Sequence, residues 1–176
     1  IYKISLYIYI HIKTTEYKPT FKEAESALKN YNGTILFEIK SEKKHINTFY
    51  PNPAEYATII YEGIKNSKLL DQFIFMSFDP EVLNELNKYF PLSNYVILEY
   101  NPFNTYQKML HSISFKPYAI GLNHSIISKK IIKKAHSDTV KVFAWTVNNK
   151  KDGRSLIRKG IDGIITDYPD IFISND

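Results

Sequence analysis

The chain has 176 residues and a formal net charge of +5, with 44% hydrophobic and 23% charged residues. This balance predicts one globular domain over residues 1–176 and excludes disordered, collagen-like and coiled-coil proteins. Cysteine is absent, which excludes disulfides, thiolate metal sites and a cysteine nucleophile. The sequence contains no run of about 18 apolar residues, so no membrane span is predicted.

The first apolar segment, IYKISLYIYIHIK (1–13), alternates isoleucine and leucine with polar or aromatic residues. This period of two indicates a β-strand. The segment has no small-residue cleavage site, which argues against a signal peptide, and the compartment stays open with the cytoplasm slightly favoured. The sequence begins without methionine, which favours a fragment of a longer protein.

From residue 34 onward, apolar runs rich in β-forming residues alternate with polar turns and helical stretches. The near-continuous apolar character of these runs predicts strands that are buried on both faces, as in a parallel sheet. The predicted strands are 34–40, 72–78, 95–99, 117–123, 141–147 and 163–167.

Helices are predicted between these strands. Asn52 followed by Pro53, and Asp79 followed by Pro80, are typical of an N-cap and the first residue of a helix. A further helix is predicted directly after residue 125, and a short last helix is predicted to end at Gly160.

The densest basic cluster, SKKIIKK (128–134), places four lysines around two isoleucines in the helix predicted after residue 125. This pattern is typical of the solvated face of an amphipathic helix. Binding of a phosphate backbone is the alternative, but no nucleic-acid-binding motif supports it. The sequence therefore predicts no nucleic-acid partner.

Six strands at a short, regular period, without a glycine-rich phosphate loop, favour a TIM (β/α) barrel over an open doubly wound sheet. A complete barrel usually takes about 250 residues. The predicted fold is therefore an α/β protein, an incomplete TIM barrel whose first two βα units are missing or degenerate. Such a barrel has two open sheet edges, which predicts self-association through them.

In this fold the chemistry lies where strands end in their following loops. Glu38 and Lys40 stand two residues apart at the end of a predicted strand, so both side chains are expected on one face. A functional interpretation makes Glu38 a ligand of Mg²⁺ or Ca²⁺ and Lys40 the partner of a phosphate group. A structural ion pair is the other interpretation, because inward-facing charges must be paired.

Two aromatic residues stand at other strand ends. Trp145, the single tryptophan, closes an apolar run, and Phe78 closes another. An aromatic residue in a strand usually belongs to the core. The alternative for both residues is contact with a substrate, because ligand pockets are lined largely by apolar and aromatic side chains.

Four stretches carry a family resemblance: LFEIKSE, MSFDPEVLNELNKYFP, VFAWTVNN and GRSLIRKGIDGIITDYPD. Their order and spacing resemble the glycerophosphodiester phosphodiesterase family, and KPTFKEAESALKN is similar to the helix ahead of that family's third strand. The resemblance covers residues 18–172. It implies a TIM barrel that hydrolyses glycerophosphodiesters to an alcohol and glycerol 3-phosphate with a divalent metal.

The resemblance also implies roles for individual residues. Glu38 corresponds to a metal-binding glutamate, and Lys40 corresponds to a catalytic lysine that contacts the phosphate. Trp145 corresponds to a tryptophan that lines the glycerol side of the pocket, and Phe78 is expected in the same wall. The expected cofactor is Mg²⁺ or Ca²⁺, and the expected partner is a small-molecule glycerophosphodiester.

The chain departs from the family pattern near its start. The family's His-Arg-Gly and His-Asp motifs, which hold its acid and base, and its Glu-x-Asp motif, which holds two more metal ligands, cannot be read here. His11 is a candidate remnant of a catalytic histidine, with a surface position as the alternative. A second hypothesis is therefore a truncated, inactive barrel that retains phosphate and glycerol binding. The histidines expected to be structural or exposed are His45, His111, His124 and His136.

Overall fold

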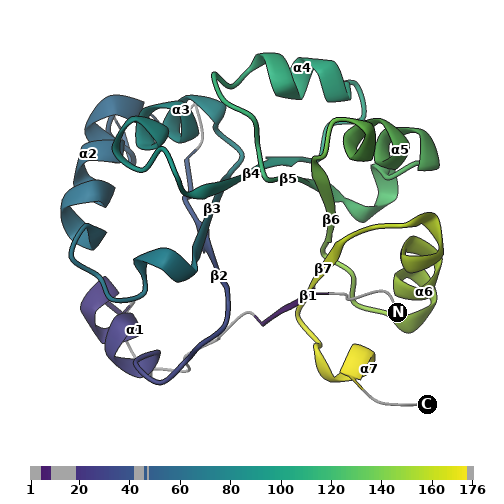
Figure 1. Ribbon diagram of the computed structural model, residues 1–176, viewed down its shortest axis with the longest axis horizontal. Helices are drawn as coiled ribbons and strands as arrows, with labels where there is room; N and C mark the ends of the chain where they lie inside the picture. The colour runs from purple at the N-terminus through teal and green to yellow at the C-terminus, as the bar shows by residue number, and fades with distance from the viewer. Residues whose placement is uncertain (1–4, 9–18, 42–45, 47, 174–176) are drawn as a thin grey trace. The chain divides into compact units, whose positions relative to one another are not determined.

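The computed structural model describes residues 5–8, 19–41, 46 and 48–173 (Figure 1). The chain divides into two units. The N-terminal unit is Ile10–Asn94, and the C-terminal unit is Tyr95–Asp176 together with Ile1–Tyr9. In both units parallel strands alternate with helices along the chain, as the sequence predicts.

In the N-terminal unit, β2 (Ile35–Glu38) pairs in parallel with β3 (Phe73–Ser77). Glu38 stands opposite Met76 in this register. The Ile39 amide donates to the Met76 carbonyl at 2.8 Å, so the pairing continues one residue past β2. The strands predicted at 34–40 and 72–78 are confirmed with slightly shorter bounds.

Two helices of this unit, α2 (Pro53–Ile64) and α3 (Pro80–Tyr89), begin where the sequence predicts. Asn52 caps α2 and Asp79 caps α3, each accepting a hydrogen bond from a backbone amide of the first turn. The cap accepts from one amide that has no partner inside the helix, and the proline has no N–H group that needs a partner.

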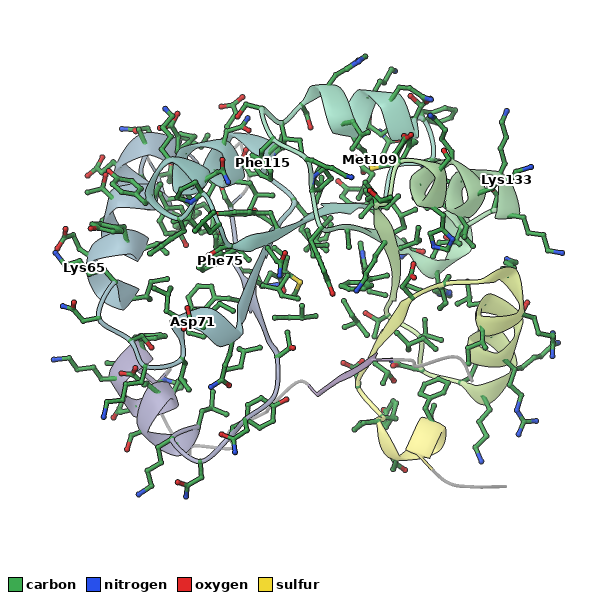
Figure 2. The ribbon with its side chains drawn as sticks, viewed as in Figure 1. Lys65, Asp71, Phe75, Met109, Phe115 and Lys133 are labelled. Carbon is green, nitrogen blue, oxygen red and sulfur yellow. The ribbon has the colours of Figure 1, made fainter. Side chains whose placement is uncertain are left out.

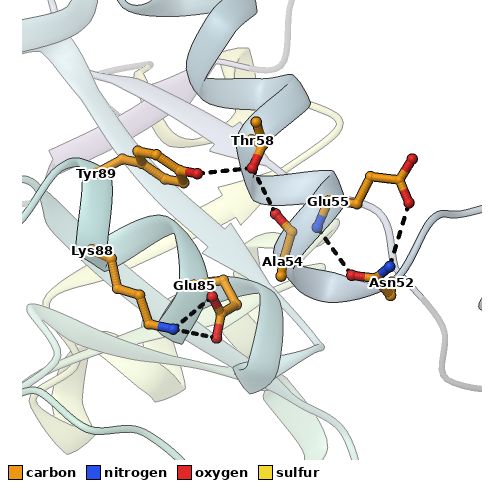
Figure 3. A network of polar contacts seen from close by, with 7 residues as sticks. All are labelled: Asn52, Ala54, Glu55, Thr58, Glu85, Lys88 and Tyr89. Atoms are coloured by element: carbon orange, nitrogen blue, oxygen red, sulfur yellow. Dashed lines mark hydrogen bonds and ion pairs between the residues drawn. The ribbon is translucent and has the colours of Figure 1, made fainter.

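Side chains join α2 to α3 (Figure 3). The Thr58 hydroxyl donates to the Ala54 carbonyl within α2 at 3.0 Å and lies 2.8 Å from the Tyr89 hydroxyl on α3. The Tyr61 ring stacks on the Tyr89 ring with centroids 4.5 Å apart. This combination of stacking and hydrogen bonding fixes the two helices against each other.

A third helix of the unit, α1 (Phe21–Ala27), begins with a capping box. The Thr20 hydroxyl accepts from the Glu23 amide, and the Glu23 carboxylate accepts from the Thr20 amide at 2.7 Å. The 3-10 turn η2 (Leu70–Gln72) leads into β3. The helix expected ahead of β2 is therefore present, and local side chains define its start.

A phenylalanine cluster packs on one face of the β2–β3 pair. Neighbouring ring centroids lie 5.2–6.2 Å apart, and the pairs are tilted, edge-on or, for Phe75 and Phe90, stacked. Burial of a phenylalanine side chain contributes about 1.5–3 kcal/mol, so the cluster holds the helical layer against this face. Its members are Phe21, Phe37, Phe73, Phe75 and Phe90; Phe75 is labelled in Figure 2.

The strands of the C-terminal unit pair in parallel in the order β1-β7-β6-β5-β4. Each of them coincides with a strand that the sequence predicts, including the first apolar segment, although β4 begins one residue earlier than predicted. Their bounds are β1 (Ser5–Ile8), β4 (Asn94–Glu99), β5 (Ala119–Asn123), β6 (Lys141–Trp145) and β7 (Gly163–Thr166).

Two helices of the C-terminal unit are predicted. The predicted end of the later helix is confirmed, and the predicted start of the earlier helix is wrong. α6 (Lys150–Lys159) ends at Gly160, whose φ of 100° suits glycine, as predicted. α5 (Lys129–Ser137) begins later than predicted. The 3-10 turn η3 (His124–Ile126) comes first, and Ser128 then caps α5, so a local cap overrides the apolar residues that follow 125.

The sequence pattern does not predict α4 (Tyr106–His111) or α7 (Asp170–Ile173). Both are too short to show a helical period. α4 depends instead on the Thr105 cap and on burial of Tyr106 and Met109, which the tertiary structure provides. Within the described ranges, no helix has the length and apolar character needed to cross a membrane.

Close packing in the C-terminal unit leaves no room for a side chain at Gly121 on β5. A Cβ atom at this position would lie 2.7 Å from Leu98 Cδ2 and 3.2 Å from Val96 Cγ1, both on β4. Gly63 on α2 differs, because a Cβ atom there would meet nothing within 4 Å. The two glycines therefore offer a matched pair of substitutions.

Gly121→Ala is expected to lower the free energy of unfolding by about 1–3 kcal/mol, because the added methyl group overpacks the β4–β5 contact. Gly63→Ala is expected to raise it by about 0.5–1 kcal/mol, because alanine favours a helix. Urea unfolding followed by circular dichroism measures both changes. A Gly121→Ala variant as stable as the parent protein would contradict the packing of β4 against β5.

Candidate functional site

The predicted Glu38–Lys40 pair lies at the carboxyl end of β2. Because side chains alternate along a strand, Glu38 points to the face opposite Phe37 and the phenylalanine cluster. The Lys40 Nζ atom lies 2.7 Å from Glu38 Oε1. The Glu38 side chain is 18% exposed and the Lys40 side chain 68% exposed, so the ion pair is open to solvent.

This ion pair does not hold Lys40 tightly. An exposed ion pair contributes about 0–1 kcal/mol, because water screens the charges and the side chains lose entropy. The Lys40 ammonium can therefore leave Glu38 for another anion at small cost. A structural ion pair and a phosphate contact are compatible at this position.

A buried hydrogen-bond network, the Asp79 network, holds the segment that follows β2. The Ser41 hydroxyl donates to the Asp79 carboxylate at 2.8 Å, and Asp79 is 2% exposed. The Ser77 hydroxyl donates to the Ile39 carbonyl at 2.8 Å and accepts from the Asp79 amide at 3.0 Å. Lys40 stands between Ile39 and Ser41, so its backbone is fixed on both sides.

The sequence predicts Asp79 only as a helix cap and does not predict the network. Part of the signal is local, because a serine two residues before an aspartate often forms a turn through its side chain. The other part is not local, since Ser41 and Asp79 are separated by 38 positions. Only the pairing of β2 with β3 brings them together.

Tyr56 on α2 reaches the same segment. Its hydroxyl donates to the Lys40 carbonyl at 3.3 Å, and its ring stacks on that of Tyr50 with centroids 6.0 Å apart. Burial, and then the charge that Tyr50 would carry, raises the pKa of Tyr56. The phenol therefore stays protonated and keeps donating, so the Lys40 backbone is held while its side chain remains exposed.

Phe78 lies in the N-terminal unit directly after β3. It is 38% exposed, whereas Phe75 within the strand is fully buried. The interpretation of Phe78 as a core residue is therefore wrong. Its side chain is partly exposed to solvent.

Trp145 is the last residue of β6 and stands opposite Asn123 of β5. It is half-buried. Its Cδ1 atom lies 3.6 Å from the place that a Cβ atom of Gly121 would take. The indole therefore lies at ordinary van der Waals distance from the Gly121 position on this face of the sheet.

The loop that follows Trp145 is tied to the end of β7 through Asn148. The Asn148 Nδ2 group donates to the Asp167 carboxylate at 2.8 Å. Its Oδ1 atom accepts from the Asp167 amide at 3.1 Å and from the Thr166 hydroxyl at 3.2 Å. The sequence pattern predicts no role for Asn148, although this residue belongs to a stretch that carries the family resemblance.

The structure brings some of the predicted site residues together. Glu38 and Lys40 are in contact, and Phe78 belongs to the same unit. Trp145 belongs to the C-terminal unit. Glu99, at the end of β4, accepts from the Tyr100 and Asn101 amides at 2.8 and 2.7 Å, so it organises its own loop.

The histidines do not form a described catalytic group. His11, the candidate remnant of a catalytic histidine, lies outside the described residues, as does His45. The His136 Nε2 atom lies 2.8 Å from the Asp162 carboxylate, which also accepts from the Val142 amide at 2.8 Å. This contact ties α5 to β6 and gives His136 a structural position.

The residues available for a metal ion are few. Across residues 5–8, 19–41, 46 and 48–173, no three His, Asp or Glu side chains gather in a way that could hold a metal. A divalent ion such as Mg²⁺ prefers about six oxygen ligands. The described residues alone therefore do not fit a divalent ion.

Parallel strands that alternate with helices, with polar side chains at the carboxyl ends of the strands, define an α/β protein of the TIM barrel class. Comparison with known families adds the particular assignment. The chain belongs to the glycerophosphoryl diester phosphodiesterase family, whose sequence profile matches residues 8–171. The family resemblance of the four stretches is confirmed.

Two curated relatives carry the name glycerophosphodiester phosphodiesterase. The protein from Bacillus altitudinis is 26% identical over 134 residues, which cover 76% of this chain and 54% of the relative. The protein from Caldanaerobacter subterraneus is 26% identical over 157 residues, which cover 89% of this chain and 60% of the relative. The chain therefore spans between half and two thirds of the length of these relatives.

Solved structures show the same fold. An Oleispira antarctica phosphodiesterase, in complex with the product sn-glycerol-3-phosphate, matches with a TM-score of 0.72 at 20% identity, over 86% of this chain and 58% of that one. A glycerophosphodiester phosphodiesterase from Parabacteroides distasonis matches with a TM-score of 0.67 at 21% identity, over 86% and 61%. The predicted α/β barrel class is confirmed.

Asp79→Ala is expected to lower the free energy of unfolding by about 2–5 kcal/mol, because it removes both the cap of α3 and the acceptor for Ser41. Ser41→Ala removes one hydrogen bond to a carboxylate and is expected to cost about 1.5–3 kcal/mol. The double variant should cost less than the sum, because both changes remove the same bond. Urea unfolding measures all three, and additive losses would contradict a direct contact.

Proposed function

We propose that this chain takes part in the metal-dependent hydrolysis of glycerophosphodiesters to an alcohol and glycerol 3-phosphate. The observation that carries the proposal is the Glu38–Lys40 pair, open to solvent at the carboxyl end of a strand in a member of this family. The product bound to the Oleispira antarctica phosphodiesterase, which has the same fold, supports the class of substrate.

Lys40 is the residue to which we assign the phosphate. A phosphodiester carries one negative charge at neutral pH, and attack by water adds charge to its phosphoryl oxygens. An ammonium group that is already in place stabilises the growing charge without reorganising solvent. The Asp79 network and Tyr56 support this role, because they fix the Lys40 backbone and leave its ammonium exposed.

Trp145 and Phe78 are assigned to the glycerol part of the substrate. A flat apolar ring suits a carbon backbone, whereas the lysine serves the charged end. The partial exposure of both aromatic residues supports this division of labour.

Glu38 is proposed as one ligand of a divalent ion, Mg²⁺ or Ca²⁺. Glu38 would contribute one carboxylate to such an ion, and the chemistry supplied there would be stabilisation of negative charge on the phosphoryl group. The described residues do not complete the ligand set of the ion, and the proposed role of Lys40 does not depend on it. Within the chain, Glu38 also pairs with the Lys40 ammonium at 2.7 Å.

Phosphate and glycerol binding without hydrolysis is the second candidate function. The observation that favours it is the absence, among the residues described, of a carboxylate and histidine group able to hold a metal. Lys40 and Trp145 would keep their binding roles under this alternative. Measured turnover separates the two functions.

Lys40→Ala is expected to lower kcat for release of glycerol 3-phosphate from glycerophosphocholine by about 10²–10³-fold, with a smaller change in KM, because the lost charge acts mainly in the transition state. Lys88→Ala is the matched control. It breaks an exposed ion pair with Glu85, 2.6 Å long, on α3 of the same unit, and should leave the rate unchanged. An enzyme-coupled assay of glycerol 3-phosphate measures both rates.

The same assay, run with Mg²⁺, with Ca²⁺ and after EDTA, tests the reaction itself. Release that stops with EDTA and returns with the metal would support hydrolysis by this chain. No release with either metal, together with retained binding of glycerol 3-phosphate, would support the binding function. Equal turnover of Lys40→Ala and Lys88→Ala would contradict the role of Lys40.

Trp145 is the single tryptophan, so its fluorescence reports on this position alone. Glycerol 3-phosphate is expected to change the emission of Trp145, since the ligand would replace water beside the indole. Lys40→Ala should raise the apparent Kd by about tenfold or more, because a charge-assisted contact is lost. Inorganic phosphate, which lacks the glycerol part of the ligand, is the control. Constant emission at ligand concentrations that saturate binding by calorimetry would contradict the placement of Trp145 at the substrate.

A further inference from the structure

A groove lies between α4 and α5 of the C-terminal unit. Its volume is about 520 Å³, within the range of roughly 300–1,000 Å³ that small-molecule sites occupy. It shares no residue with the proposed phosphodiester site. The lining residues that matter are Tyr106 on α4, and Ser128, Lys130, Ile131, Lys133 and Lys134 at α5.

The charge around this groove is positive. Neither α4 nor α5 contains an acidic residue. Lys134 pairs with Asp138 at 3.1 Å, whereas Lys130 and Lys133 have no carboxylate partner in the part of the chain that the structure describes. Lys133, labelled on α5 in Figure 2, is exposed. An anion at this rim would meet two ammonium groups that lack a counter-charge.

The start of α5 adds to this field. Ser128 caps the helix by accepting from the Ile131 amide at 3.3 Å, and Ser128 itself lines the groove. The first turn of α5 contains no acidic residue. The partial positive charge of a helix N-terminus therefore acts in the same sense as the lysines.

The walls of the groove also offer apolar surface. Ile131 is half-buried, and Tyr106 is 4% exposed, so its ring forms part of the wall. The methylene stems of Lys130 and Lys133 can cover apolar surface while their ammonium groups stay in water. A small inorganic anion would leave these walls without a partner.

Tyr106 contributes a polar group as well. Its hydroxyl is buried and lies close to the Asp138 carboxylate. Burial, and then the nearby Asp138 carboxylate, raises the pKa of Tyr106 to about 12. The phenol is therefore uncharged at neutral pH and adds no negative charge to the wall of the groove.

We infer that the groove between α4 and α5 binds a single-chain anionic amphiphile, with its head group on Lys130 and Lys133 and its alkyl chain along Ile131 and Tyr106. A phosphate ester and a carboxylate are both oxyanions, so either head group can pair with these ammonium groups. A nucleic-acid backbone fits less well, because such sites usually neutralise about six to ten phosphates. Two unpaired lysines beside an apolar wall match one charge joined to one chain.

Isothermal titration calorimetry with decyl phosphate, below its critical micelle concentration, tests the inference on the whole chain. Decyl phosphate is expected to bind at least about tenfold more tightly than inorganic phosphate or decanol. Inorganic phosphate lacks the alkyl chain, and decanol lacks the charged head group. Decanoate distinguishes a phosphate-specific head-group site from a site that also accepts carboxylates. The measurement does not involve hydrolysis, so it is independent of the proposed function.

Charge reversal locates the site. Lys130→Glu/Lys133→Glu is expected to weaken decyl phosphate binding by at least about tenfold, because both cationic partners of the head group are lost. Lys22→Glu/Lys29→Glu, which changes the net charge equally on exposed positions of the N-terminal unit, is the control and should bind as the parent does. Ile131→Ser should weaken decyl phosphate but not inorganic phosphate.

Three results would overturn the inference: equal affinity for decyl phosphate and inorganic phosphate, parent-like binding by Lys130→Glu/Lys133→Glu, or equal losses in that variant and in its control. Far-UV circular dichroism verifies folding of each variant. If the double glutamate variant does not fold, Lys130→Gln/Lys133→Gln removes the charges without reversing them. It should weaken decyl phosphate in the same direction.

Discussion

The buried carboxylate of Asp79 is the constraint on which the proposed site depends. A carboxylate that is 2% exposed is costly unless hydrogen bonds satisfy it. One oxygen accepts from the Ser41 hydroxyl, and the other accepts from the first turn of α3. Because Ser41 directly follows Lys40, the bond that satisfies the buried charge also fixes the residue proposed to hold phosphate. Stability and site geometry share one interaction.

The two faces of the β2–β3 pair divide stability from chemistry. One face carries the phenylalanine cluster, and Glu38 points to the other. An alternating strand can therefore hold a helical layer through Phe37 and present a carboxylate one residue later. Neither function requires the other face to change.

Much of the fold could be predicted from the sequence, as could the family. The strands were predictable because a period of two or a continuous apolar run is a local property of the chain. The starts of α2 and α3 were predictable because Asn52 and Asp79 cap amides within their own first turn. The contact between Glu38 and Lys40 follows from a spacing of two, which the backbone geometry of a strand imposes.

The sequence by itself thus determined the order of the elements, their capped starts and the family. The tertiary structure alone decided that Ser41 meets Asp79 across 38 positions, that Phe78 is open rather than buried, and that α4 forms beside α5. The physical reason is the range of the interactions. Periodicity and caps act within one turn of backbone, whereas burial and hydrogen bonds between distant residues exist only once strands and helices have packed.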